Sequence, residues 1–308
     1  MIEITNEPIF EVLDIIQNML DSNKIVEVII PNPDLGSSLY GGTTLKNGST
    51  HHSWRAWSDL ATILHSRMLT PEVISKERVI LRLERLNKTQ SFHKRKDINN
   101  EERYGVESIF ADINKNEEPA FIYAYSQALK QVDISNRDSV LDLGINRGDE
   151  FLAIEKILTK DRFNEIKLIG IDHSLSAISK AKEIFHQQNA EFYCHDINYL
   201  EKLNLPKVDL IISIGTLQSP NINFKMLFMS LIQNYLNPQG AIILGFPNSR
   251  WIDGEMVYGA KSLNYSSSEM SLVIKDIYFC KKYLQQHKFR VTITGKEYIF
   301  LTAKKINF

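Results

Sequence analysis

The 308-residue sequence has only two cysteines and no long apolar run, and its charges nearly cancel. Cys194 and Cys280 are too few for a disulfide scaffold and lack metal-ligand spacing, so we expect reduced thiols and a cytoplasmic protein. No apolar run reaches the roughly 20 residues that span a bilayer, so no membrane partner is expected. The formal net charge of -1 excludes a global field that draws the whole chain to nucleic acid.

Two familiar nucleotide-binding motifs are also missing. In the stretch VLDLGINRGDE (140–150), Asn146 and Asp149 replace the second and third glycines of a dinucleotide fingerprint. No G-x-x-x-x-G-K-[ST] phosphate loop occurs anywhere in the chain. The adjacent His51 and His52 do not have ligand spacing, and no catalytic triad is visible. NAD, ATP and metal sites are therefore not expected, and no catalytic residue is assigned.

Short apolar runs alternate with helical patterns from about residue 138 onward. The runs are continuous, as in parallel strands that are covered on both faces, and they lie at 138–144, 167–172, 190–196, 208–213 and 240–246. Two further strands, 289–294 and 297–305, are separated by only two residues and must be antiparallel. The sequence predicts an α/β fold with a doubly wound, seven-stranded, mostly parallel sheet and an antiparallel C-terminal hairpin. The intervening helices are expected at 117–132, 150–159, 174–188, 224–236 and 274–287.

The N-terminal part has a less regular pattern and predicts a smaller α+β region. Helices are expected at 8–20 and 53–66, and strands at 25–30 and 78–86. Trp54 and Trp57 are three residues apart on the second helix and are expected to pack against the sheet domain. We place the boundary near Asn116, with residues 1–115 as a region that selects or encloses substrate and residues 116–308 as the sheet domain.

The turn after the first predicted sheet strand has its own pattern, D-x-G-x-N-x-G, formed by Asp142, Gly144, Asn146 and Gly148. Such a loop lets a ligand approach the backbone closely, and an acid beside it suits a cationic ammonium group. Asparagine tolerates a positive φ better than most residues, so Asn146 can keep the turn. The stretch resembles motif I of the class I S-adenosylmethionine-dependent methyltransferases.

This resemblance extends over residues 116–308 and implies S-adenosylmethionine (SAM) as the cofactor. It implies that Asp172, at the end of the second strand, binds the ribose hydroxyls and that His173 lies against the adenine. It further implies that Asp196 takes the adenine amino group with Ile197 beside the ring, and that Ser213 and Gly215 lie near the sulfonium. All of these residues follow strands at the edge where ligands bind open α/β sheets.

The acceptor of the methyl group is less constrained by the sequence than the cofactor. Methyl transfer from a sulfonium needs alignment and exclusion of water more than an acid–base apparatus. We expect a small polar or anionic acceptor, with candidate contacts from the segment after the fifth strand and from the segment between the domains: Arg250, Trp251, Tyr258, Arg103 and Tyr104.

Two alternatives to a small-molecule methyltransferase stay open at this point. Residues 76–96 hold eight basic and two acidic residues, a net charge of +6 that fits either an RNA or nucleotide-bearing substrate or an ordinary charged strand face. The chain is alternatively a SAM-binding module without catalysis. The absence of a pattern of stacking aromatics favours a small molecule over nucleic acid. The oligomeric state and the acceptor atom are not indicated.

Overall fold

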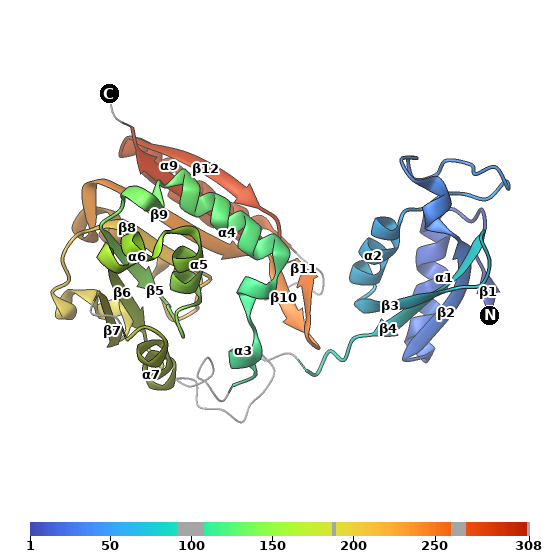
Figure 1. Ribbon diagram of the computed structural model, residues 1–308, viewed down its shortest axis with the longest axis horizontal. Helices are drawn as coiled ribbons and strands as arrows, with labels where there is room; N and C mark the ends of the chain where they lie inside the picture. Colours follow the sequence, from blue (N-terminus) through green and yellow to red (C-terminus); the bar gives the residue numbers. More distant parts are fainter. Residues whose placement is uncertain (91–107, 187–188, 260–268, 307–308) are drawn as a thin grey trace. The chain divides into compact units, whose positions relative to one another are not determined.

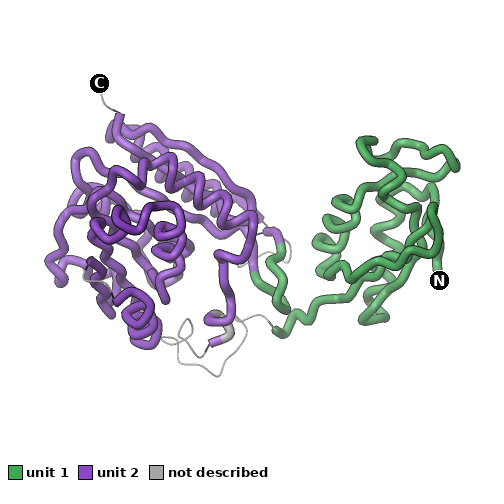
Figure 2. Tube along the Cα trace, viewed as in Figure 1, with its two compact units in different colours: residues 1–94, 251–257 green, residues 95–250, 258–308 purple. Residues whose placement is uncertain are grey.

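The computed structural model describes residues 1–90, 108–186, 189–259 and 269–306, and the chain forms two compact units. The first contains residues 1–94 and 251–257, and the second contains residues 95–250 and 258–308 (Figure 2). We expected the boundary near Asn116. Residues 108–115 instead belong to the second unit, where α3 (Ile109–Asp112) is held by Arg147 through the carbonyl of Ala111.

The second unit is built on a seven-stranded sheet with the strand order β12-β13-β9-β8-β5-β6-β7 (Figure 1). Neighbouring strands from β9 to β7 pair in parallel, and β13 pairs antiparallel with both β9 and β12. The predicted mostly parallel sheet with its C-terminal hairpin is confirmed. The strands are β5 (Ser139–Leu143), β6 (Lys167–Asp172), β7 (Ala190–Cys194), β8 (Val208–Ile214), β9 (Leu236–Pro247), β12 (Phe289–Gly295) and β13 (Tyr298–Lys305).

Both faces of this sheet are covered by helices, which is why its strands read as continuous apolar runs. Successive residues of a strand enter opposite layers of core: Val140 belongs to one, and Leu141 and Leu143 belong to the other. The first layer contains α4 (Pro119–Gln131), α5 (Asp149–Ile157), α6 (Lys160–Glu165) and α7 (Leu175–Ile184). The second contains α8 (Phe224–Ser230), a π-helical turn (Leu231–Tyr235) and α9 (Ser271–Gln286).

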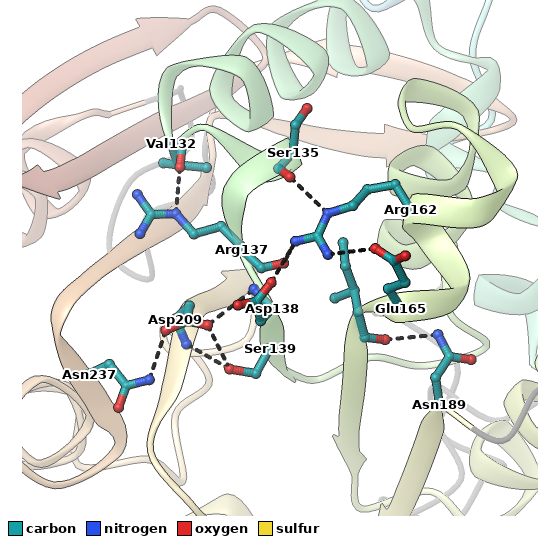
Figure 3. A network of polar contacts seen from close by, with 11 residues as sticks. Val132, Ser135, Arg137, Asp138, Ser139, Arg162, Glu165, Asn189, Asp209 and Asn237 are labelled. Carbon is teal, nitrogen blue, oxygen red and sulfur yellow. Dashed lines mark hydrogen bonds and ion pairs between the residues drawn. The ribbon is translucent and has the colours of Figure 1, made fainter.

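A polar network closes the edge of the sheet at which β5, β6 and β8 begin (Figure 3). Arg162 binds two backbone carbonyl oxygens, and its guanidinium lies 2.8 Å from the Asp138 carboxylate. Asp209 accepts hydrogen bonds from the Asp138 amide at 3.1 Å and from two side chains. The remaining partners of these residues are Ser135, Arg137, Ser139, Glu165 and Asn237.

The first unit is a four-stranded sheet in the order β1-β2-β4-β3, with two helices packed on it. Its elements are β1 (Ile2–Glu3), α1 (Ile9–Ser22), β2 (Ile25–Pro31), α2 (Trp54–Ile63), β3 (Ser66–Val73) and β4 (Arg78–Arg85). Trp57 is 1% exposed in this unit's own core, and Trp54 packs on the same core and donates its indole N–H to Asp34. The expectation that the two tryptophans pack against the sheet domain was therefore wrong.

Strand β3 was not predicted, because the sequence pattern suggested only the helix that precedes it. Pro71 interrupts the strand and cannot donate to a ladder, which is tolerated because β3 lies at the edge of the sheet. The pairing with β4 shifts register between Leu69 and Glu72, on either side of that proline. An interrupted edge strand has neither a continuous nor an alternating apolar pattern, so the sequence indicates it poorly.

The first unit is completed by a hairpin that follows β9 directly in the chain. Its strands β10 (Ser249–Ile252) and β11 (Glu255–Tyr258) pair with each other. Asp253, at the turn, forms an ion pair with Arg67 at 2.8 Å and accepts the amide N–H of Asn87 at 3.0 Å. Residues 251–257 therefore belong to the N-terminal unit although they come late in the sequence.

Candidate functional site

The loop after β5 is held in a conformation that few residues can adopt. Gly144, Asn146 and Gly148 have φ values of 79°, 48° and 99°. A Cβ on Gly144 would lie 1.9 Å from Oγ1 of Thr216, and one on Gly148 would lie 2.4 Å from the Phe185 ring. Asn146 keeps the left-handed turn as expected. The two glycines are required both by φ and by space.

Asp142 is a buried carboxylate at the base of this loop. It is 1% exposed, and neither of its oxygens has a hydrogen-bond partner among the described residues. Burial raises the pKa of Asp142 well above its usual value, and the charge of Glu150 acts in the same direction. An unpartnered buried acid is costly, and binding a ligand cation relieves that cost.

Asp172, the last residue of β6, connects the loop to the following helix. One oxygen accepts the amide N–H of Asn146 at 3.0 Å, and the other accepts that of Ser174 at 3.0 Å. Ser174 caps α7, as predicted, by accepting the amide N–H of Ala177. His173, half exposed, has Nδ1 3.4 Å from Asp172. Each carboxylate oxygen can accept a second hydrogen bond, so these contacts leave capacity for a ligand.

The other predicted cofactor residues follow β7 and β8. Asp196 lies two residues beyond β7 and accepts the amide N–H of Asn198 at 2.9 Å, while the adjoining Ile197 is 6% exposed. Ser213 donates its hydroxyl to Leu143 O, on β5, at 3.3 Å. Gly215 has a φ of 75° and forms the turn after β8. Since β7, β6, β5 and β8 are consecutive in the sheet, its order brings all predicted cofactor residues to one edge.

The sequence analysis did not predict that residues 111–117 lie against the loop at 144–148. The Arg147 guanidinium donates to the carbonyl oxygens of Ala111 at 2.8 Å and Ile113 at 3.3 Å. Lys115 lies 3.0 Å from Glu150; the Glu150 side chain is buried and that of Lys115 is 12% exposed. Burial opposes the charged form of Lys115, yet the charge of Glu150 prevails and raises its pKa. These contacts hold segment 111–117 against the loop. The sequence around Lys115, just before the predicted helix at 117–132, did not indicate this contact.

The predicted substrate residues are only partly brought together. Arg250 belongs to the sheet unit and Trp251 to the N-terminal unit, and both are partly buried. Tyr258 is 43% exposed, and its hydroxyl lies 3.5 Å from the Met270 sulfur. Arg103 and Tyr104 lie outside the described residues, so their predicted contact with the cofactor or the substrate stays a prediction.

The basic run is largely compensated within the N-terminal unit. Arg78 pairs with Glu3 at 2.6 Å, and Arg82 pairs with both Glu27 and Glu72 at 2.6 Å. These acids come from β1, β2 and β3, so Arg78 and Arg82 are paired on the sheet face, while Arg85 donates to the carbonyl oxygens of Leu20 and Asp21. Ion pairs of this kind leave less positive charge for phosphates.

The described part of the chain offers no other obvious cofactor chemistry. Within it, no group of three or more His, Cys, Asp or Glu side chains is placed to hold a metal ion. None of its helices is long and apolar enough to cross a membrane.

Comparisons with known proteins indicate the family to which the chain belongs. A family model described as a methyltransferase domain matches residues 134–294, just over half of the chain. The carboxy-S-adenosyl-L-methionine synthase of Helicobacter pylori (strain Shi470) is 27% identical over 139 residues, which are 44% of this chain and 55% of the relative. The same enzyme from strain G27 matches to the same extent. The chain thus spans about half the length of the curated relatives it matches.

Similar solved structures are more distant in sequence. The plantazolicin methyltransferase BamL is 15% identical with a TM-score of 0.43, and the match covers 62% of this chain and 88% of that one. A SAM-dependent methyltransferase from Aquifex aeolicus is 14% identical with a TM-score of 0.41, and the match covers 64% of this chain and 98% of that one.

Proposed function

The chain belongs to the family of methyltransferase domains, of the class that uses SAM, and we propose that it transfers the methyl group of SAM to a small polar or anionic acceptor. The observation that carries the proposal is the unpartnered, buried Asp142 carboxylate beneath a loop that has no room for a side chain at Gly144. A loop of this kind fits a ligand that combines a cationic group with close backbone contact.

The residues at the sheet edge fit the chemical groups of the cofactor. Asp142 is placed to balance the ammonium group, and Asp172 has acceptor capacity for the ribose hydroxyls. Asp196 and Ile197 would hold the adenine through one polar and one apolar contact. The left-handed turn at the end of β8 favours a glycine, Gly215, so no side chain occupies the place where the sulfonium would lie. These assignments stay predictions.

The bound cofactor supplies an activated methyl group, which passes to a nucleophile of the acceptor as the carbon–sulfur bond breaks and S-adenosylhomocysteine is left. The chain's own part is to hold both reactants in line and to keep water away. Loop 144–148 and the segment fastened by Arg147 form a fixed frame for the cofactor. No described side chain needs to take a proton in this scheme if the nucleophile is unprotonated when it attacks.

A small acceptor is favoured over RNA by the pairing in the basic run. Arg78 forms an ion pair with Glu3, and Arg82 forms ion pairs with Glu27 and Glu72. A face whose arginines are already paired supplies little of the salt-dependent attraction on which RNA binding rests. We infer that the N-terminal unit selects or encloses the acceptor, while the sheet unit holds the cofactor. A cytoplasmic location stays a prediction.

Calorimetry with SAM and with S-adenosylhomocysteine tests the cofactor assignment. Asp172→Ala should weaken binding about 10- to 100-fold, because hydrogen bonds to a charged acceptor are lost. Asp161→Ala, at an exposed position on α6, is the matched control and should bind as the parent does. Unchanged affinity in Asp172→Ala would remove the ribose assignment. A wild-type chain that binds neither compound would remove the proposed function.

A further inference from the structure

The carboxyl end of β9 has a buried amide whose oxygen has no partner. Asn248 is 2% exposed, its backbone N–H donates to Glu297 O at 2.7 Å, and its side-chain NH2 donates to Lys296 O at 3.0 Å. The second bond fixes the orientation of the amide, because only the nitrogen can donate to a carbonyl. The amide oxygen of Asn248 therefore points away from Lys296 O, and no described residue donates a hydrogen bond to it.

Two charged groups with unused atoms lie close to this amide in the chain fold. Glu297 binds Lys296 through one carboxylate oxygen at 3.1 Å, while the other oxygen is buried and has no partner. The Arg250 Nε is buried without a partner, and the guanidinium makes no hydrogen bond or ion pair within the described ranges. Arg250 is two residues beyond Asn248, at the start of β10.

The location of this group relates it to the cofactor edge. β9 pairs with β8 through Ile214 and Gly245, and a Cβ on Gly215 would lie 3.3 Å from Pro247. Asn248 comes directly after that proline. The three residues therefore lie just beyond the strand end that neighbours Gly215, on the side away from the predicted ribose and adenine residues of β6 and β7.

We propose that Asn248, Arg250 and Glu297 bind the acceptor, and that the acceptor carries both an acid and an amine, as an α-amino acid does. The inference rests on the proposed methyl transfer. A guanidinium fork matches a carboxylate, and the two unpartnered oxygens of Asn248 and Glu297 match the N–H groups of an ammonium. An acceptor with an acid alone leaves both oxygens buried and unpaired, and one with an amine alone leaves the arginine unpaired, which is costly in either case.

An untargeted labelling experiment identifies the acceptor. The wild-type chain is incubated with isotopically labelled SAM and the low-molecular-mass fraction of native cell extract, and mass spectrometry finds the labelled product. The expected product contains a carboxylate and an amine. A labelled product that lacks either group overturns the proposal, and so does label found only in RNA or protein, or in no product, while SAM still binds.

Variants test Arg250 and Glu297 separately from cofactor binding. Arg250→Gln and Glu297→Gln should each raise KM for that acceptor about 10- to 100-fold, with the Kd for S-adenosylhomocysteine unchanged within about twofold. Arg250→Lys, which keeps the charge but not the planar fork, should lie between Arg250→Gln and the parent. The matched control is Arg290→Gln, an exposed arginine on β12. If the Arg250 and Glu297 variants behave like this control, the proposal is wrong.

Discussion

The two edges of the seven-stranded sheet treat their polar groups in opposite ways. At the edge where the parallel strands begin, Arg162 and Asp209 are bound by backbone and side-chain partners (Figure 3). At the opposite edge, buried atoms of Asp142, Asn248 and Arg250 have no partner among the described residues. The core between the two edges is continuous, so the difference belongs to the edges and not to the fold as a whole.

This difference separates groups that stabilise the unit from groups that are available to a ligand. Native structures satisfy nearly all of their buried polar groups, so unpartnered atoms gathered at one edge require an explanation. At the strand ends where open α/β sheets bind their ligands, the explanation is a bound molecule. Substitutions at the closed edge should therefore change stability, whereas substitutions at the open edge should change binding.

Gly144→Ala should have the largest effect and should act on binding. The new Cβ would meet Thr216 at 1.9 Å at a φ of 79°, so the loop must move. We expect the affinity for SAM to fall about 1,000-fold or more, about 4 kcal/mol, in calorimetry. Gly48→Ala is the control, because its φ of 83° is similar but its Cβ would meet nothing within 4 Å. Gly48 lies in the N-terminal unit, so this control should leave the affinity unchanged, and equal losses in both variants would show that the effect is not specific to the loop at Gly144.

Arg162→Ala tests the closed edge and should lower the free energy of unfolding by about 2–3 kcal/mol. It removes donors from the carbonyl oxygens of Ser135 and Arg137 and from Asp138. Denaturant titration measures the loss, and Arg290→Ala at an exposed site should change stability by less than about 0.5 kcal/mol. A weaker affinity for SAM in the folded Arg162→Ala protein would contradict the claim that this edge affects stability and not binding.

Asp142→Asn should stabilise the protein by about 1–2 kcal/mol near neutral pH while weakening SAM binding. Burial raises the pKa of this carboxyl in the folded state, so the penalty on folding is full above the folded-state pKa and declines to zero as the pH falls from there to the lower pKa of the unfolded chain. The gain from the substitution should therefore be largest at high pH and shrink in acid. Unfolding titrations at several pH values measure it. A gain that grows in acid would contradict the assignment.

Asn146→Gly should have the smallest effect, because glycine adopts the φ of 48° at least as readily. We expect affinity within about threefold of the parent and stability within about 1 kcal/mol. Asn146→Val, with a β-branched side chain in the left-handed region, should lose more of both. The same calorimetry and denaturant titrations measure these changes, and a tolerated valine would mean that the loop does not need this conformation.

The sequence predicted the sheet and its edge well, because both depend on local patterns. The continuous apolar runs of β5, β6 and β8 reflect burial on two faces, and the predicted acids Asp142, Asp172 and Asp196 lie at or just beyond the C-terminal ends of β5, β6 and β7. Asn146 could be assigned a left-handed turn because few other residues accept one. These features require only neighbouring residues in the chain, and the sequence is sufficient for them.

The features that the sequence did not predict depend on partners far away in the chain. Lys115 is largely withdrawn from solvent with Glu150 against it, and Arg82 is paired with acids on two other strands. The unpartnered oxygen of Asn248 is defined by its bond to Lys296, 48 residues later. A residue that owes its state to a distant contact has no pattern of its own.

The hairpin at β10 and β11 has a consequence for the order in which the protein is made. Its Asp253 completes the N-terminal unit by binding Arg67 and Asn87. A ribosome delivers residues in sequence, and an N-terminal domain ordinarily folds before the next one is synthesised. Here the first unit stays incomplete until residue 257 has been synthesised. By then the residues of β5, β6, β7, β8 and β9 have all been synthesised. The last contacts of the first unit therefore form after most of the second unit has been synthesised.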